Sequence, residues 1–219
     1  MAVFAIVLLL VAAYLLGSIP TGYVIARWLK GIDIRQYGSG GTGATNVLRT
    51  VGKKAAIAVL IFDLLKGTLA VLLVTALWPR VLGLAPEPSL VSALQPWITM
   101  LAGLLAILGH SKSVWINFTG GKSAASGLGV LLGLAWPAAL GATAAFGVTL
   151  ALSRIVSLGS MAAALMAVIL MVVMGQPLPY VVLVIVGATY VILRHRSNID
   201  RLLAGTEPRL GQQSSNHGS

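Results

Sequence analysis

Long apolar runs separated by short polar stretches dominate the pattern of hydrophobic and polar positions along the chain. A bilayer core of about 30 Å needs about 20 apolar residues for each spanning helix. Five runs approach or exceed that length, and they cover residues 2–27, 54–78, 93–110, 156–174 and 178–195. The pattern therefore predicts a membrane helix at each of these positions.

A sixth apolar run, residues 123–152, fits either one long tilted helix or two short ones. Its middle reads "LAWPAAL". Pro137 favours a break there because proline removes a backbone hydrogen bond, and Trp136 favours one because tryptophan prefers the membrane interface. We therefore divide this run into two short helices.

The positions of the charged residues support the same division. Lys and Arg collect in cytoplasmic loops. With residues 27–54 cytoplasmic and two helices in the sixth run, this rule accounts for all 15 Lys and Arg except Lys66 and Arg80. A single helix would leave Arg154 and the C-terminal arginines outside. We predict an all-α integral membrane protein with seven transmembrane helices, its N-terminus outside and its C-terminus cytoplasmic.

The seven helices are expected to form a single membrane domain over residues 1–204. The segment that follows, residues 205–219, is polar and rich in Gly, Ser and Gln, which predicts a partly disordered tail. His217 within it is expected to have no role. The first apolar run lacks the basic start of a signal peptide, since Arg27 and Lys30 follow it, and is predicted to be a retained helix.

Composition agrees with a membrane protein. The chain has 58% hydrophobic and 9% charged residues, and its mean hydropathy is +0.94. A net charge of +10 would suggest nucleic-acid binding in a soluble domain, but cytoplasmic loops explain the cations here, so no nucleic-acid partner is expected. The absence of cysteine excludes disulfides, protein thioesters and cysteine-ligated metal sites.

The first polar group is "DIRQYGSGGTGATNVLR", which ends at Arg49. Glycines let backbone N–H groups approach a ligand and form a concave anion site, and Arg49 offers a planar fork suited to phosphate. The side chains of Ser39, Thr45 and Asn46 add further donors. The alternative is a mobile juxtamembrane loop in which Arg49 is anchored to lipid headgroups.

The second polar group is "LGHSKSVWINFTGGKSAASG". It supplies His110, Gly120, Gly121 and Lys122 at the start of a predicted short helix. A helix N-terminus with a nearby lysine can bind phosphate, although Lys122 could instead be a topology anchor, as is favoured for Lys112. A nucleotide-hydrolysing P-loop is not supported, because Ile116 stands where that motif needs glycine.

Two further groups contain ionisable or polar pairs. Asp63 and Lys66 in "FDLLKG" lie three residues apart on one helix face, and such buried charges usually pair, so a structural and a catalytic role remain equally open. His195 and Asn198 in "RHRSNIDRLLAGTE" have the same spacing and share a face if the last helix extends that far. The nearby arginines are mostly interpreted as topology anchors. Ser157 and Ser160 begin the sixth predicted helix, where helix capping is the alternative to a site.

Five ordered motifs resemble the PlsY family of acyl-phosphate:glycerol-3-phosphate acyltransferases. They read "GSIPTGY", "GxDIRxxGSG..GATN..R", "DLLKG", "GH…F.GGK" and "RHxxNIxRLxxGTE", and they run from Gly17 to Glu207. The resemblance implies a bacterial inner-membrane enzyme of phospholipid synthesis, with its site on the cytoplasmic side. It would transfer a fatty acyl group from acyl-phosphate, and not from acyl-CoA or acyl-carrier protein, to glycerol 3-phosphate, giving lysophosphatidic acid and phosphate. No metal or other cofactor is expected. An enzyme that produces acyl-phosphate is a candidate partner.

The resemblance also implies site residues. Catalytic residues would be Ser39, Arg49, Lys122, His195 and Asn198. Substrate-binding residues implied by the resemblance would be Gly38, Gly40, Gly43, Gly120, Gly121 and Ser160. The polar groups described above add Thr45, Asn46 and His110 to this set. The chain departs from the family where Gly41 replaces asparagine, Thr119 replaces lysine and Ser123 replaces glycine, which affects how firmly phosphate would be held.

Two alternatives remain. His195 and Asp200 spell His-x4-Asp, the dyad of an unrelated acyltransferase class in which histidine is the general base, whereas the family resemblance assigns the base to a substrate phosphate. A transporter for a phosphorylated solute would also explain Asp63 and Lys66 inside the membrane. Against it, the polar groups cluster on one side of the membrane, and no inverted repeat is visible.

Overall fold

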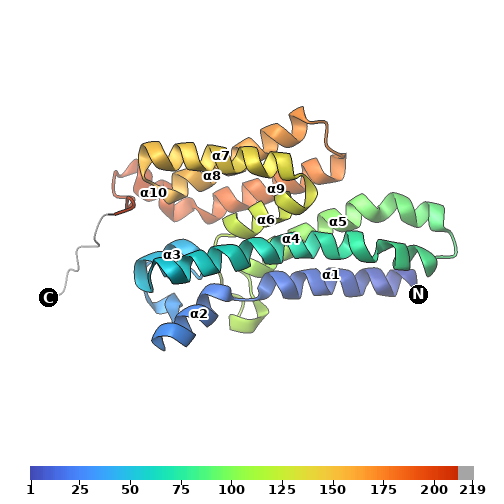
Figure 1. The fold of residues 1–219 in the computed structure, drawn as a ribbon, viewed down its shortest axis with the longest axis horizontal. Coiled ribbons are helices and arrows are strands. Elements are labelled where there is room, and N and C mark those ends of the chain that lie inside the picture. The colour runs from blue at the N-terminus through green and yellow to red at the C-terminus, as the bar shows by residue number, and fades with distance from the viewer. Residues whose placement is uncertain (212–219) are drawn as a thin grey trace.

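The computed structural model describes residues 1–211, which form helices and loops without a strand. The helices are α1 (Ala2–Ser18), α2 (Thr21–Lys30), α3 (Ala44–Thr50), α4 (Lys53–Gly83), α5 (Pro88–Ser111), α6 (Ala124–Leu134), α7 (Trp136–Ser153), α8 (Val156–Val173), α9 (Leu178–Arg194) and α10 (Arg196–Leu203). Short 3-10 turns lie at Ile34–Gln36 and Val114–Ile116. The long helices run side by side, and α10 lies at the opposite end of the bundle from the N-terminus (Figure 1).

The helical membrane character predicted from the sequence is confirmed. By length and composition, five helical units among the described residues could cross a membrane: α1 with α2, α4, α5, α7 and α8. The number rises to six if α9 and α10, which are bent by 56°, count as one span. Helix α6 has 11 residues, about 16 Å, and is shorter than a bilayer core. Seven spans and the orientation of the termini therefore remain predictions.

The apolar run predicted over residues 2–27 belongs to one candidate membrane span, Ala2–Lys30, but its helix is interrupted. Helix α1 ends at Ser18 and α2 begins at Thr21. Pro20 causes the break, because proline has no N–H to donate and its ring disfavours helical geometry at the preceding Ile19. By contrast, the break expected in the sixth run is confirmed, since α6 and α7 are separate helices.

Glycines bring α4 and α6 into close contact. A Cβ atom built on Gly129 of α6 would lie 2.0 Å from the carbonyl oxygen of Leu64, and one built on Gly67 of α4 would lie 2.2 Å from that of Ser126. Only residues without a side chain let two helix backbones approach this closely. The contact fixes α6 on α4 and so fixes the start of α6, where one wall of the candidate site begins.

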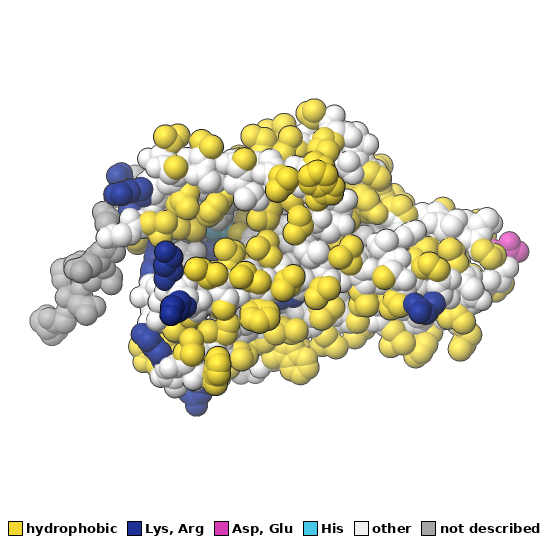
Figure 2. Space-filling model, in the orientation of Figure 1, with side chains coloured by type: hydrophobic (Ala, Val, Ile, Leu, Met, Phe, Trp, Pro, Cys, Tyr) yellow, Lys and Arg dark blue, Asp and Glu magenta, His cyan; other side chains and the backbone are white. Residues whose placement is uncertain are grey.

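The surface is divided into apolar flanks and a charged end. Hydrophobic side chains cover much of the visible flank, while most visible Lys and Arg lie at the end that holds α2, α3 and α10 (Figure 2). Apolar flanks suit lipid, and cations at one end follow the charge rule for membrane proteins.

The described part of the predicted tail packs against the helices. The backbone N–H of Leu210 donates to the carbonyl oxygen of Arg154, 2.7 Å away, in the turn between α7 and α8. Glu207 is buried beside α8 and α10. The remaining tail, including His217, lies outside the described residues.

Candidate active site

One cavity of about 540 Å³ brings most of the predicted site residues together. Its lining includes Ser39, Gly43, Thr45, Asn46, Arg49, Asp63, His110, Gly121, Lys122, Ser160, His195 and Asn198. Four predicted residues are not in the lining: Gly38, Gly40, Gly120 and Lys66. The helices that carry the lining come from both halves of the chain, so only the folded bundle forms this cavity.

Most of the remaining cavity wall is apolar. Side chains of α4, α6, α7, α8 and α9 supply it, among them Leu64, Leu131, Phe146, Ala167 and Val184. The cavity therefore joins a polar, cationic end to a channel that suits a hydrocarbon chain.

Asn46 holds the glycine-rich loop in shape. Its side chain is nearly buried and donates to the carbonyl oxygens of Tyr37 (3.0 Å) and Gly41 (2.8 Å), while its oxygen accepts from the N–H of Ser39 (3.0 Å). These bonds use most of the polar capacity of the amide. The geometry thus gives Asn46 a structural role, and its contact with substrate stays a prediction.

The glycines of this loop differ in backbone conformation and in the space available for a side chain. Gly38 and Gly40 have positive φ angles of +58° and +70°, which favour glycine, and a Cβ atom on Gly38 would lie 2.3 Å from Asn46 Oδ1. A Cβ atom on Gly41 would meet nothing closer than Ser39 Oγ, at 3.8 Å. The departure at Gly41 therefore removes a side chain from a place that has room for one.

Arg49 presents an available cation at the edge of the cavity. It lies in the last turn of α3, its side chain is exposed, and no described residue pairs with it. A guanidinium without a protein partner can bind phosphate with two parallel hydrogen bonds.

Gly120 and Gly121 allow their segment to lie directly against the end of α5. Cβ atoms on Gly120 and Gly121 would lie 2.2 Å from the carbonyl oxygen and from Nε2 of His110, respectively. The N–H of Gly121 donates to that same carbonyl at 3.2 Å and is therefore used within the protein. Close packing explains both glycines and carries Lys122, the next residue, into the cavity; their contact with phosphate stays a prediction.

A chain of polar contacts extends from Lys122 to the C-terminal segment. Lys122 Nζ donates to Asn198 Oδ1, and Asn198 Nδ2 donates to Glu207 Oε1 at 2.5 Å. The same carboxylate accepts from Ser157 Oγ and from Arg201 Nε, each at 2.7 Å. Because Glu207 takes the amide N–H of Asn198, the amide oxygen is turned toward Lys122.

Glu207 was not among the residues predicted for the site. It follows Gly205 in a polar segment that was assigned to the tail, although it closes the motif that contains His195 and Asn198. Burial works to raise the pKa of Glu207, but hydrogen bonds from Asn198, Ser157 and Arg201 outweigh it, and the pKa lies below its usual range. Glu207 could have been identified by its rarity, because the chain has only 5 acidic residues and one of them ends this motif.

The charge of Lys122 is weakened by its surroundings. Burial and the neighbouring guanidinium of Arg201 lower the pKa of Lys122 to about 8, while Glu207 opposes the shift. The ammonium is therefore charged at neutral pH, but Glu207 does not fully offset the burial and the nearby guanidinium groups. An anionic ligand would add negative charge beside the ammonium.

His195 lies at the bend between α9 and α10. The helix does not continue through it, so the expected shared helical face with Asn198 is replaced by a 56° bend that still leaves both side chains in the cavity wall. His195 Nδ1 lies 2.7 Å from the carbonyl oxygen of Val191, which fixes the proton of the neutral ring on Nδ1 and leaves Nε2 as an acceptor. Asp200 is exposed and is not the partner of this nitrogen.

Asp63 and Lys66 form a buried ion pair at the break between α1 and α2. Their charged atoms are 2.8 Å apart, Thr21 Oγ1 donates to Asp63 Oδ1 at 2.6 Å, and Lys66 Nζ donates to the carbonyl oxygen of Ile19 at 2.9 Å. His110 Nδ1 lies 3.4 Å from Asp63 Oδ1. Since Lys66 is outside the cavity lining and the pair joins three helices, the geometry favours a structural role.

Two serines of the site also make local contacts. Ser160 Oγ donates to the carbonyl oxygen of Val156, one turn earlier in α8, at 3.0 Å. Ser123, which replaces a family glycine, has a φ of +64° and donates to the carbonyl oxygen of Ile107 at 2.8 Å. This hydrogen bond offsets part of the cost of left-handed geometry for a residue with a side chain.

Comparisons with known proteins identify the relatives of this chain. The family model for glycerol-3-phosphate acyltransferases matches residues 7–205. A glycerol-3-phosphate acyltransferase of Trichormus variabilis is 56% identical over 93% of this chain and 91% of the relative. Glycerol-3-phosphate acyltransferase 2 of Rhizobium johnstonii is 58% identical over 93% of this chain and 94% of the relative.

Solved structures extend the comparison to the fold. The glycerol 3-phosphate form of PlsY, an integral membrane glycerol 3-phosphate acyltransferase, is 37% identical, with a TM-score of 0.82 over 94% of this chain and 96% of that chain. The lysophosphatidic acid form gives a TM-score of 0.80 over the same shares. Together with the family match, this likeness shows that the chain belongs to the glycerol-3-phosphate acyltransferase family.

Proposed function

We propose that the protein transfers a fatty acyl group from acyl-phosphate to glycerol 3-phosphate, giving lysophosphatidic acid and inorganic phosphate for phospholipid synthesis. The observation that carries the proposal is the cavity of about 540 Å³, whose cationic end holds Arg49 and Lys122 and whose remaining wall is mostly apolar. The first part suits two phosphate groups and the second suits an acyl chain. Polar lining at one end only also supports an enzyme over a solute transporter, whose path needs polar groups throughout.

The chemistry requires little from the protein beyond positioning and charge stabilisation. The glycerol hydroxyl attacks the acyl carbonyl, a new carbon–oxygen bond forms, and the bond between the acyl carbon and the phosphate oxygen breaks. The hydroxyl proton passes to the departing phosphate, so the reaction balances without a protein base. Arg49 and Lys122 hold the phosphate charges, while Ser39 and His195 Nε2 orient the hydroxyl group.

The carboxylates support this choice of proton acceptor. Glu207 accepts three hydrogen bonds and is therefore not placed as a free base. The charge of Asp63 is compensated by Lys66, which pairs with Oδ1, although Oδ2 has no hydrogen-bond partner among the described residues. The cationic end, which the charge rule assigns to the cytoplasm, supports a bacterial inner-membrane location with access to soluble glycerol 3-phosphate. An enzyme that produces acyl-phosphate remains a candidate partner.

The test is an assay of purified protein in detergent with palmitoyl-phosphate and glycerol 3-phosphate. Lysophosphatidic acid and phosphate are expected to appear in equal amounts. A parallel assay with palmitoyl-CoA examines the donor, and the proposal expects no product there. Folded protein that forms neither product from palmitoyl-phosphate would refute the proposal, and equal activity with palmitoyl-CoA would refute the assigned donor.

Replacing Asp200 by asparagine is expected to leave turnover near normal. The Nδ1 atom of His195 is held by the Val191 carbonyl, so Asp200 cannot act on the histidine as in a His-x4-Asp dyad. Steady-state kcat with both substrates saturating gives the answer. A loss of about 100-fold or more would instead support histidine as the general base.

The activity is expected to fall at alkaline pH. A lysine whose pKa is lowered to about 8 is charged below that pH and neutral above it, so kcat/KM should decrease above about pH 8. The break in the pH profile of kcat/KM measures the free enzyme. Lys122→Arg, which stays charged, should be less active but lose that break; an unchanged break in this variant would contradict the assignment.

A further inference from the structure

Two loops from distant parts of the chain form the polar end of the cavity. The glycine loop, residues 31–43, supplies Ser39 and then leads into α3 and Arg49. The lysine loop, residues 112–123, supplies Lys122. Because each loop leads to one phosphate-suited cation, the distance between the loops sets the spacing of the groups that those cations hold.

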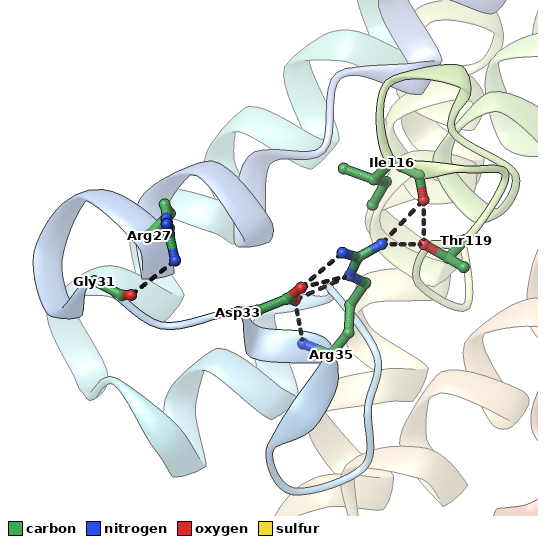
Figure 3. A network of polar contacts seen from close by, with 6 residues as sticks. All are labelled: Arg27, Gly31, Asp33, Arg35, Ile116 and Thr119. Atoms are coloured by element: carbon green, nitrogen blue, oxygen red, sulfur yellow. Dashed lines mark hydrogen bonds and ion pairs between the residues drawn. The ribbon is translucent and has the colours of Figure 1, made fainter.

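Arg35 joins the two loops. Its Nη1 donates to the carbonyl oxygen of Ile116 at 3.1 Å and to Thr119 Oγ1 at 3.3 Å (Figure 3). Thr119 Oγ1 itself donates to the Ile116 carbonyl at 2.6 Å, so both acceptors belong to one tight turn. Within residues 1–211, no other hydrogen bond connects the glycine loop with the lysine loop.

The guanidinium is fixed on its other side. Arg35 Nη2 and Nε bond to the two carboxylate oxygens of Asp33 at 2.6 and 2.9 Å, and the N–H of Arg35 donates to the same carboxylate at 3.0 Å. The ring of Tyr23 lies 5.2 Å from the guanidinium carbon. The two side chains of the ion pair are 28% and 19% exposed, so water screens this pair less than it screens one on an open surface.

We propose that Arg35 is a positioning residue for acyl transfer, which holds the glycine loop and the lysine loop at the separation that aligns the two substrates. The inference rests on the proposed function. The planar guanidinium of Arg35 is necessary because the same side-chain group must bond to Asp33 and to the lysine loop at once. The ammonium of a lysine cannot make both sets of bonds in this geometry. The chain's own Thr119 adds an acceptor that a lysine at this position would not provide.

Arg35 should affect the rate of the bound complex more than binding. The two substrate phosphates are held by Arg49, which follows the glycine loop, and by Lys122, which lies in the lysine loop. Separating the loops would leave each of these contacts intact, but it would misalign the glycerol hydroxyl with the acyl carbonyl. Errors of about 1 Å between reacting groups can cost about 100-fold in rate. A purely structural role would instead lower the amount of folded protein and leave the turnover of each folded molecule unchanged.

The experiment compares Arg35→Met and Arg35→Lys with the wild-type protein. Both variants are expected to lower kcat by about 10- to 100-fold. The Kd of glycerol 3-phosphate from calorimetry and the KM of palmitoyl-phosphate should each change by less than about 3-fold. Thr119→Ser should have the kcat of the wild-type protein. Thr119→Val, which leaves the Ile116 carbonyl in place as an acceptor, should lower kcat by a smaller factor than Arg35→Lys does.

The outcomes separate the explanations. Wild-type kcat in Arg35→Lys would overturn the inference, because charge alone would then suffice. A large loss of glycerol 3-phosphate binding with kcat retained would overturn it too, since Arg35 would then serve one binding site. Thermal unfolding of each variant gives the fraction of folded protein, and kcat is expressed per folded molecule. If Arg35→Met does not fold, the kcat of Arg35→Lys tests the inference. A wild-type protein without acyl transfer refutes the proposed function itself, and the role of Arg35 in it fails as well.

Discussion

Replacing Lys122 by methionine is expected to lower kcat/KM by about 100- to 1,000-fold, a loss typical of removing one preorganised charge from a reacting site. Lys122 projects into the cavity, where its partner is the neutral amide of Asn198, so its charge is available to a phosphate group. Methionine keeps most of the side-chain length and removes the ammonium. Initial rates of lysophosphatidic acid formation, with both substrates varied, measure the effect.

Lys112→Met provides the matched control. Lys112 lies on the same loop, but its side chain is exposed and it is absent from the cavity lining. Its variant should retain wild-type kcat/KM within about 2-fold, as expected for a surface substitution away from the site. Similar losses in both variants would mean that loop charge as a whole matters, and the role given to Lys122 would be incorrect.

Gly129→Ala is expected to destabilise the protein by more than about 2 kcal/mol, at the high end for an overpacked site. The added Cβ atom would lie 2.0 Å from a backbone oxygen of α4, which cannot rotate away as a side chain can. The helix pair must separate, and Lys122 at the start of α6 moves with it. Thermal unfolding in detergent and the specific activity of the folded fraction should therefore both decrease.

Gly147→Ala is the corresponding control in α7. A Cβ atom on Gly147 meets nothing within 4 Å, so the only expected effect is the gain in helix propensity, about 1 kcal/mol in water. A Gly129→Ala protein that unfolds at the wild-type temperature would show that α4 and α6 are not held at this distance.

The sequence predicted the helices well wherever an apolar run ended in charged or polar residues. It failed at Pro20, because the run continues through the proline and hydropathy alone does not register a missing N–H. Pro137 was interpreted correctly because a tryptophan and the charge distribution pointed to the same break. Element type thus followed from composition, while the break at the first proline required attention to backbone chemistry.

The sequence predicted which residues belong to the candidate site better than it predicted how those residues are placed. Side chains that could bind phosphate were found because their chemistry is unusual in an apolar chain, and the cavity contains most of them. Sequence could not separate residues that face the cavity from those that support it. Asn46 and Gly120 are explained by contacts within the protein, and Glu207 was assigned to the tail because its partner Asn198 meets it only in the fold.

The bond from Lys66 to the Ile19 carbonyl has a consequence for how the chain enters the bilayer. A lone lysine at the centre of a helix opposes membrane insertion by about 3 kcal/mol. The helix that contains Lys66 is synthesised after α1, so the broken end of α1 is already present as a hydrogen-bond acceptor when that charge arrives. Asp63 neutralises the charge within the same helix. Because of this order of synthesis, Lys66 can enter the membrane paired with Asp63 and bonded to the Ile19 carbonyl, and not as an isolated cation.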